Sequence, residues 1–402
     1  MLEKIYVAAY QQSKFGKLMG MTVPGIVDTA VRETFSSIQA DPALADVASI
    51  GACTNIALHQ QGLLAGLVAM TPGLSGKPIE TVENACATGG QAILSVVRKL
   101  LLGEGEVGLA VGFEKMRDAE GKVDGALIGK ALTCYTHPDE RIGKLSVVPH
   151  LFAEVMEAYM KAYGVTERDL AAVAVQEYAN ARSNPFAQMQ KNDVTLEKAL
   201  AIEGINRYVV DGLPLKTYDC SQITDGWAGI VLATEEGLSR LGVARKDAVL
   251  LAGYGQATDP LKKAGRDVLK PAGALEAMRK AYAMADLCPD SVDVAEVHDC
   301  FTVMGAMGAE VIGKADFGEG ARYWVEGKAA PGGECGINTS GGLIAKGHPI
   351  GATGISMVGW CAWQLLGKAP APLQVKSARA AATFNIGGPI CASVCTVLTP
   401  GA

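Results

Sequence analysis

Short runs of apolar and β-branched residues alternate along most of the chain with longer stretches in which apolar residues recur at helical spacing. In the first part of the chain these runs predict strands at residues 4–9, 47–52, 79–84 and 108–112. Helices are expected between them, including one that follows Cys86 and extends to about Leu102. Alternating strands and helices are typical of a layered α/β fold with helices on both faces of the sheet.

The C-terminal part of the chain repeats this order of elements. Its expected strands are residues 248–254, 292–297, 380–384 and 390–398, and its expected helices are residues 273–285, 302–312 and 351–366. The repeat is visible in the order of elements rather than in residue identity, and it indicates an internally duplicated fold.

The alternation breaks between about Arg117 and Tyr218, where polar turns accompany two expected helices at residues 147–163 and 167–183. A long insertion in one βα unit usually builds a lid or a substrate-binding cap. A strand at residues 228–233 then closes the first half. We therefore expect three parts, which are residues 1–116 with 219–240, an inserted loop domain at 117–218, and residues 241–402.

Composition narrows the class of protein. Of the 402 residues, 49% are apolar and 19% are charged, which predicts a compact globular chain. The formal charge of −6 argues against a nucleic-acid partner or a basic membrane anchor. Neither a signal-peptide pattern nor a membrane-spanning apolar stretch is recognisable, so a cytoplasmic protein is expected. The ten cysteines form no CxxC pair and show no metal-ligand spacing, so we expect reduced thiols and no metal site.

Cys86 is the first candidate for catalysis. It lies where an expected strand runs into an expected helix, with small residues on both sides at 84–90. The unpaired N–H groups and positive dipole end of that helix favour thiolate over thiol. Small neighbours would also let a substrate carbonyl approach the sulfur. Taken alone, the pattern leaves a buried apolar cysteine as an equally good interpretation.

Two of the five histidines have unusual settings. His298 directly follows the expected strand at 292–297, and His348 lies in a glycine-rich loop at 341–354, just before a helix. Loops placed by a rigid scaffold are where catalytic groups collect. The glycine-rich loop lacks the Gly-Lys-Ser/Thr ending of a phosphate-binding loop, so nucleotide hydrolysis is not expected.

Together these segments resemble the thiolase superfamily over essentially the whole chain. Residues 84–90 (NACATGG) are similar to its nucleophile segment, and residues 347–354 (GHPIGATG) to its second signature. Residues 112–116 and 219–226 also match segments of that family. The resemblance implies a thiolase-like α/β fold of two duplicated βαβαβαββ halves, in a five-layered α/β/α/β/α arrangement with an inserted loop domain.

One departure from the usual thiolase pattern is informative. The chain has His298-Asp299-Cys300-Phe301 where typical thiolases have Asn-Glu-Ala-Phe, and residues 385–389 (NIGGP) lack their C-terminal catalytic cysteine. This combination resembles the sterol-carrier-protein type thiolases with their bacterial and archaeal relatives. In that subgroup the second sulfur comes from the position of Cys300.

The resemblance implies an acyl-CoA C-acyltransferase that cleaves 3-oxoacyl-CoA with CoA, or condenses acyl-CoAs in the reverse direction. His348 would take the proton of Cys86, and Cys86 would then carry the acyl group. Cys300 would exchange the proton at the α-carbon, and His298 would help bind the enolate oxygen. The backbone N–H groups of Cys86 and Gly387 would form the other oxyanion hole.

Coenzyme A is expected as substrate and product, without a separate cofactor. Its expected contacts are Arg182, Arg207 and Lys216 in the insertion, whose shape would set the acyl specificity. The resemblance also implies a homodimer or homotetramer, and some relatives act with a small OB-fold protein.

Alternative functions stay open at this level. A decarboxylating, ketosynthase-like enzyme shares the Cys-His-His set but lacks the second cysteine, so Cys300 discriminates against it. A specialised acyltransferase would use the same site. A protein of another class, a non-catalytic acyl-CoA or lipid binder or a scaffold subunit, would not be acylated on Cys86.

Overall fold

The computed structural model describes residues 3–141, 143 and 147–401. Its strands are β1 Tyr6–Gln12, β2 Val47–Gly51, β3 Ile79–Val82, β4 Val107–Glu114, β5 Gly226–Ala233, β6 Val249–Thr258, β7 Val294–Val297, β8 Gly336–Ile337, β9 Ala381–Gly387 and β10 Ala392–Pro400. Within the described residues they form a ten-stranded sheet in the order β3-β2-β4-β5-β1-β6-β10-β9-β7-β8.

The sheet consists of two halves with the same topology. In the first, β2 lies parallel to β3 and β4, and the pairs β4–β5 and β5–β1 are antiparallel. In the second, β7 lies parallel to β8 and β9, and the pairs β9–β10 and β10–β6 are antiparallel. The halves join where Tyr6 and Val7 of β1 pair with Leu250 and Val249 of β6. The predicted duplication is therefore confirmed.

Helices cover both faces of each half. They are α1 Val23–Ser36, α2 Asn55–His59, α3 Leu64–Val68, α4 Thr88–Leu101, α5 Gly125–Thr133, α6 Val147–Tyr163, α7 Glu167–Arg182, α8 Leu196–Leu200, α9 Glu235–Leu241, α10 Ala272–Ala285, α11 Thr302–Val311, α12 Gly320–Val325 and α13 Ile350–Leu365. With one or two helices in each connection, both halves read βαβαβαββ, and α5 to α8 form the insertion between β4 and β5.

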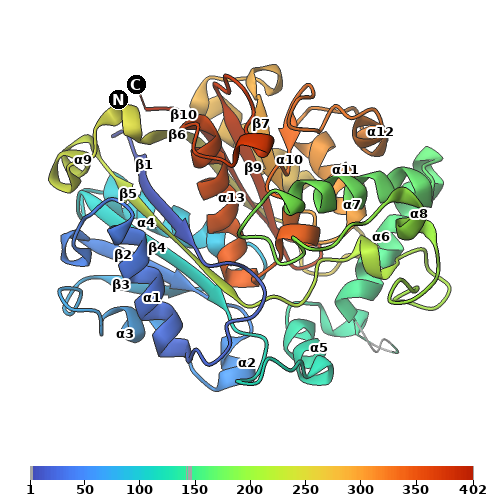
Figure 1. The fold of residues 1–402 in the computed structure, drawn as a ribbon, viewed down its shortest axis with the longest axis horizontal. Helices are drawn as coiled ribbons and strands as arrows, with labels where there is room; N and C mark the ends of the chain where they lie inside the picture. The colour runs from blue at the N-terminus through green and yellow to red at the C-terminus, as the bar shows by residue number, and fades with distance from the viewer. Residues whose placement is uncertain (1–2, 142, 144–146, 402) are drawn as a thin grey trace.

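Helices α4 and α13 form the central layer. Both pack on strands of both halves, and α13 runs through the middle of the molecule between them (Figure 1). Helices α1 and α3 pack on the first half, whereas α10 and α11 pack on the second, which gives the five layers expected of a thiolase-like fold. The two central helices touch through their backbones, because a Cβ added at Gly89 would lie 2.7 Å from the N atom of Gly354. This contact brings together the segments that precede α4 and α13.

The local sequence explains how these central helices form. Helix α13 is buried on nearly every side, which fits a sequence that is apolar all round rather than on one face. Helix α4 begins at Thr88, two residues after Cys86, and a basic pair in its last turn complements its dipole. Cys86 therefore lies just outside the helix rather than within it.

The insertion lies beside the C-terminal half (green in Figure 1). Helices α6 and α7 have the extent that the sequence predicts, to within one residue. Helix α7 packs against α11, α12 and a π-helical turn at Gly342–Lys346. The rings of Phe152 in α6 and Phe301 stack with centroids 4.7 Å apart, so the insertion contacts the segment that carries His298 and Cys300.

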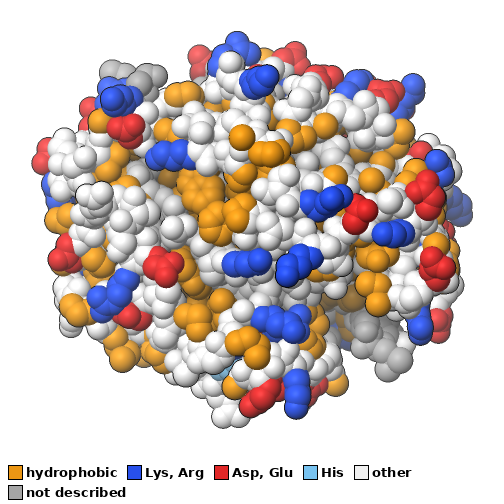
Figure 2. Space-filling view, in the orientation of Figure 1, with side chains coloured by type: hydrophobic (Ala, Val, Ile, Leu, Met, Phe, Trp, Pro, Cys, Tyr) orange, Lys and Arg blue, Asp and Glu red, His pale blue; other side chains and the backbone are white. Residues whose placement is uncertain are grey.

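Surface charge is mixed. Basic and acidic side chains are interspersed over the face drawn in Figure 2. Among the described residues, no helix has the length and apolar character needed to cross a membrane.

Candidate active site

A cavity of about 390 Å³ lies where the two halves meet the insertion, and its wall is mostly apolar. Cys86, His298, Cys300 and His348 all line it. The insertion contributes residues of α5 and α6, including Ile128 in α5. The sequence-predicted catalytic residues therefore share one cavity, although they are far apart along the chain.

Three of these side chains approach one another closely. The sulfur of Cys86 and a ring nitrogen from each of His298 and His348 all lie within 4.8 Å of one another. The two imidazole rings are perpendicular, with an interplanar angle of 86° and centroids 5.0 Å apart. Such spacing permits proton transfer between the thiol and an imidazole without a large movement.

A strained backbone holds Cys86 in the cavity. Ala85 has a left-handed φ of 48°, which is uncommon for a residue with a side chain. The Thr88 hydroxyl and the Cys53 thiol both donate to the Ala85 carbonyl, at 2.6 and 2.8 Å. The same hydroxyl accepts from the N–H of Asn84 at 2.8 Å. These bonds stabilise the turn that presents the sulfur.

The surroundings of the Cys86 thiol favour its protonated form. Burial and the nearby Glu114 carboxyl raise its pKa to about 12, although the N–H groups of Gly388 and of Cys86 itself act in the opposite direction. This direction is opposite to the one that the helix terminus predicts. Loss of solvation outweighs the few amides that face the sulfur.

Hydrogen bonding assigns His348 as a proton acceptor. Its Nδ1 lies 2.7 Å from the Thr353 hydroxyl, and that hydroxyl donates to the Pro349 carbonyl at 3.2 Å. Because the hydrogen of the Thr353 hydroxyl points to the Pro349 carbonyl, the hydroxyl oxygen accepts from Nδ1–H of His348. The proton of the ring is then on Nδ1, and Nε2 keeps its lone pair. Burial lowers the pKa of His348 to about 3, so the ring is neutral at neutral pH.

Asn385 gives His298 the opposite tautomer. The N–H of Gly90 donates to the Asn385 side-chain oxygen at 3.3 Å, which fixes the orientation of the amide. Its Nδ2 then donates to the Cys86 carbonyl and to Nδ1 of His298, both at 3.0 Å. The proton of His298 therefore lies on Nε2, and this buried atom has no hydrogen-bond partner in the described part of the chain. His298 thus offers a hydrogen rather than a lone pair to the cavity, which favours binding of an oxyanion over binding of a metal.

Cys300 is the fourth side chain of the set. It is 7% exposed, and burial raises its pKa well above the usual value, with smaller contributions from the nearby Cys86 and Asp299. A thiol kept protonated beside the reacting sulfur is suited to donating a proton.

A buried polar network supports the loops that carry these residues. Asp299 accepts from the N–H groups of Leu343 and Ile344, at 2.8 and 3.0 Å. The Glu177 carboxyl of α7 lies beside Asp299, and its other side accepts from Asn338 at 2.8 Å. Burial and the neighbouring Asp299 raise the pKa of Glu177 well above its usual value, which favours its protonated form.

The second backbone donor at the sulfur differs from the predicted one. The N–H of Gly388 faces the Cys86 sulfur, and Gly388 lines the cavity. Gly387 belongs to β9, where a Cβ would lie 2.2 Å from the Asn84 carbonyl, so this position requires close backbone packing. The geometry thus points to Gly388, one residue beyond the predicted Gly387.

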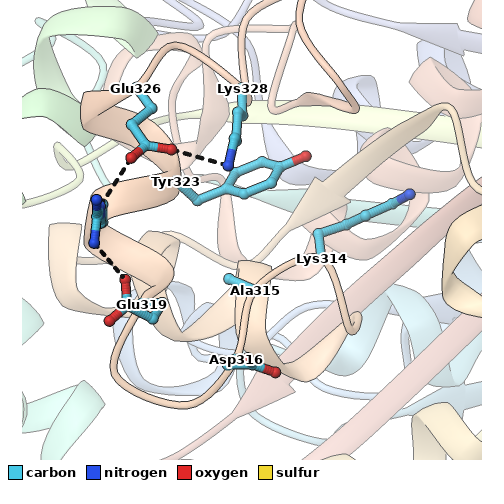
Figure 3. Close-up of a pocket in the computed structure, with 8 residues that line it drawn as sticks. Lys314, Ala315, Asp316, Glu319, Tyr323, Glu326 and Lys328 are labelled. Carbon is cyan, nitrogen blue, oxygen red and sulfur yellow. Dashed lines mark hydrogen bonds and ion pairs between the residues drawn. The ribbon is translucent and has the colours of Figure 1, made fainter.

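Another hollow, of about 330 Å³, lies over α12 and is drawn in Figure 3. Its charged groups largely neutralise one another, because Glu326 pairs with Lys328 and Arg322, and Arg322 also pairs with Glu319 (Figure 3). It contains no thiol or imidazole among its described lining residues. The cavity at Cys86 is therefore the candidate active site.

Comparison with protein families agrees with this geometry. A model of the thiolase N-terminal domain matches residues 5–236, and one described as thiolase C-terminal domain-like matches residues 255–400. The chain belongs to the thiolase family. Over 387 residues it is 32% identical to an acetyl-CoA acetyltransferase of Methanothermobacter thermautotrophicus, with 96% of this chain and 97% of that protein covered.

Other relatives place this thiolase near the subgroup that its His-Asp-Cys-Phe segment resembles. It is 29% identical to human sterol carrier protein 2 over 398 residues, with 96% of this chain and 70% of that protein covered. It is 30% identical to the benzoylsuccinyl-CoA thiolase subunit BbsB of Thauera aromatica, with 96% of this chain and 95% of that protein covered. The structure of an Ltp2-ChsH2(DUF35) aldolase has the same fold, with a TM-score of 0.82, 19% identity, and 100% of this chain and 98% of that chain covered. The fold and family predicted from the sequence are therefore confirmed.

The duplicated thiolase fold explains why the reactive groups converge. Cys86 lies between β3 and α4, and His348 lies between β8 and α13, which are equivalent places in the two halves. Because α4 and α13 pack against each other in the central layer, their preceding loops meet in one cavity. His298 follows β7, the neighbour of β8 in the sheet.

The three residues predicted to contact CoA are not among the described residues that line the cavity. Arg182 pairs with Asp193 on the surface, and Arg207 is exposed. Lys216 is fully buried, and its ammonium contacts Glu167 at 2.7 Å and Asp219 at 3.1 Å. A buried ammonium held by two carboxylates cannot reach CoA, so Lys216 is corrected to a structural residue. Arg182 and Arg207 stay predictions.

Proposed function

We propose that this acyl-CoA thiolase forms its acyl-enzyme on Cys86 and that His348 is the base for that step. The observation that carries the proposal is the convergence of the Cys86 sulfur and two neutral imidazoles within 4.8 Å, with opposite tautomers. One ring can then accept a proton while the other donates a hydrogen bond. Both roles are needed in acyl transfer through a covalent thioester.

Nucleophilic attack is coupled to proton transfer. The raised pKa of Cys86 and the lowered pKa of His348 disfavour a stable thiolate–imidazolium pair before substrate binds. The proton moves to Nε2 of His348 as the sulfur attacks the 3-oxo carbon of a 3-oxoacyl-CoA. The N–H groups of Cys86 and Gly388 are the proposed donors to the oxyanion that forms next to this sulfur.

Carbon–carbon cleavage follows from the resulting tetrahedral adduct. The bond between the former 3-oxo carbon and the α-carbon breaks, and its electron pair forms the enolate of acetyl-CoA. His298 stabilises the enolate oxygen through Nε2–H, and Cys300 donates its proton to the α-carbon. The thiol of CoA then attacks the acyl-enzyme, and its proton passes to the Cys300 thiolate. The departing Cys86 thiolate takes back the proton held on Nε2 of His348, which restores the starting state. The reverse sequence is the Claisen condensation.

Coenzyme A is the substrate and product of this cycle, and we propose no further cofactor. We also propose that the enzyme acts as a homodimer or homotetramer in the cytoplasm. One relative is named as a subunit, BbsB, which supports testing for a second chain, and a small OB-fold protein is the partner we propose.

Cys300 favours a thiolase over a decarboxylating enzyme, because a decarboxylating enzyme obtains its carbanion without removing an α-proton. The test is to mix the enzyme with acetyl-CoA in deuterium oxide and to follow two signals. Mass spectrometry should find an acetyl group on Cys86, and deuterium should enter the methyl group of acetyl-CoA. In Cys300→Ala the adduct should persist and the exchange should stop. Exchange at the wild-type rate in that variant would refute the role of Cys300, and a wild-type enzyme without an adduct would favour a non-catalytic binder.

A further inference from the structure

Two glycines of the insertion helix α5 line the cavity. Gly125, Ile128, Gly129 and Leu132 form the face of α5 that contacts the cavity, and Ala126 is exposed on another face. Glycine is the poorest helix former after proline, so two glycines on one helical face need a reason.

Packing does not supply that reason. A Cβ added at Gly125 or Gly129 would meet no atom within 4 Å among the described residues. Neither glycine has a positive φ, so neither is required by its backbone conformation. By contrast, a Cβ at Gly89 or Gly354 in the central helices would collide with backbone at less than 3 Å. Gly129 is half-buried against the cavity and thus leaves open a space that the described residues do not fill, whereas Gly125 lies at the exposed start of the helix.

The chemistry of the cavity indicates what fills this space. None of its described lining side chains is charged, and large apolar residues surround it, including Met116, Phe152 and Phe301. A ligand with a charged end would lose its hydration here without gaining a partner. An apolar group would gain free energy with each methylene that it buries.

The position of the reactive groups orients the ligand. The partnerless Nε2 of buried His298 and the Cys86 sulfur mark the place of the reacting carbonyl carbons. The rest of an acyl group bound to Cys86 and the arm of CoA whose thiol attacks it share the remaining space, whose wall includes the α5 face. A cavity of about 390 Å³ is in the range of pockets that enclose whole small ligands, and an acetyl group fills only a small part of it.

We propose that Gly129 determines acyl specificity, and that the enzyme acts on an uncharged, apolar acyl group much larger than acetyl. This inference rests on the proposed acyl-enzyme at Cys86 and adds the substrate class. Because glycine at position 129 has no side chain, the far end of the acyl group can occupy the space next to α5. A larger residue at 129 would fill that space and shorten the acyl chain that fits.

The experiment measures kcat/KM for thiolysis of acetoacetyl-CoA, 3-oxodecanoyl-CoA and a 3-oxoacyl-CoA whose chain ends in a carboxylate. The wild-type enzyme should prefer 3-oxodecanoyl-CoA to both others. In Gly129→Leu the ratio of the decanoyl to the acetoacetyl value should fall at least about tenfold, since a misfit of one methylene already costs about 10-fold to 200-fold. Gly129→Ala should show a smaller fall, and the matched exposed change Ala126→Leu should leave the ratio unchanged.

Circular dichroism and thermal unfolding check that the variants fold, and Gly129→Ala and Gly129→Leu should not unfold at a lower temperature, because the helix gains a better helix former. An unchanged ratio in a folded Gly129→Leu, or a wild-type preference for the carboxylate-ended substrate, would overturn the inference. Mass spectrometry of wild-type Cys86 separates this failure from that of the proposed function. An acyl adduct with an unchanged ratio refutes the specificity role alone, whereas no adduct with any acyl-CoA refutes both.

Discussion

The side-chain amide of Asn385 donates to Nδ1 of His298 over 3.0 Å, and this one bond decides what His298 can do in the cavity. Because Nδ1 accepts, the ring must carry its proton on Nε2. A histidine next to the nucleophile is thereby made a hydrogen-bond donor, whereas His348 on the other side has its lone pair free. The two imidazoles differ in tautomer because their Nδ1 atoms have different hydrogen-bond partners, which are Asn385 for His298 and Thr353 for His348.

Replacing Asn385 by aspartate should reverse this arrangement. A carboxylate accepts from Nδ1–H, so Nε2 of His298 would present a lone pair where an enolate oxygen needs a donor. We expect kcat to fall by about 10² to 10³, the usual loss for one oxyanion donor, with a smaller change in KM. Steady-state thiolysis measures this effect. His298→Ala is the matched comparison, because the two variants should lose kcat to a similar extent; a fully active Asn385→Asp would contradict the assigned tautomer.

The pKa of Cys86 predicts an unusual reactivity profile. Its pKa of about 12 means that the thiolate fraction keeps rising well above neutral pH, so alkylation by iodoacetamide should speed up through pH 9 without a plateau near pH 7. Peptide mapping by mass spectrometry measures the rate at each cysteine. Exposed Cys288 is the internal control, because hydrogen bonds from Ser291 lower its pKa and it should react at lower pH. A plateau for Cys86 near neutral pH would indicate a preformed thiolate–imidazolium pair instead.

Glu177 and Asp299 give a prediction for stability at high pH. The pKa of Glu177 is raised in the folded protein by burial and by Asp299. Its stabilising contribution is therefore complete below the unfolded pKa near 4.5 and is lost as pH rises through the folded pKa. Glutamine resembles the protonated acid, so Glu177→Gln should unfold at a similar temperature to wild type at pH 4.5 and at a higher one at pH 9.

The control for this prediction is Glu157→Gln, which removes an exposed carboxyl from α6. Its unfolding temperature should differ from wild type by the same amount at both pH values. A Glu177→Gln variant that loses as much stability as wild type, or more, between pH 4.5 and pH 9 would show that the pKa of Glu177 is not raised in the fold.

The sequence predicted the elements that have a local periodicity and the site residues that lie in family motifs. The alternation of apolar runs located most strands and the long helices, because each of these elements has its own periodicity. Strand β8 was missed, since two residues in a glycine-rich region carry no pattern. Cys86, His298, Cys300 and His348 were found because short segments around them match family motifs.

Features that depend on contacts between residues far apart in the chain were not predicted. Asn385 is 87 residues from His298 in the chain, so no spacing connects the two. The direction in which the pKa of Cys86 is shifted differs from the predicted one because the helix terminus is visible in the sequence, whereas the burial of the site is not. The amide that faces the Cys86 sulfur belongs to Gly388 rather than Gly387, and only the fold shows which amide of this glycine pair does so.

His348 should make the folded protein sensitive to acid. Its pKa is about 3 in the fold and near 6.5 when unfolded, so the unfolded state binds an extra proton between these values. The contribution of His348 to the free energy of unfolding is complete above the unfolded pKa of its ring and is lost as the pH falls below it. At pH 5 this residue accounts for a loss of about 2 kcal/mol relative to pH 7. Urea denaturation at the two pH values measures it. His348→Asn should lose about that much less than wild type on acidification. Equal losses in His348→Asn and wild type would mean that the ring is charged in the fold, and such a ring could not accept the proton of Cys86.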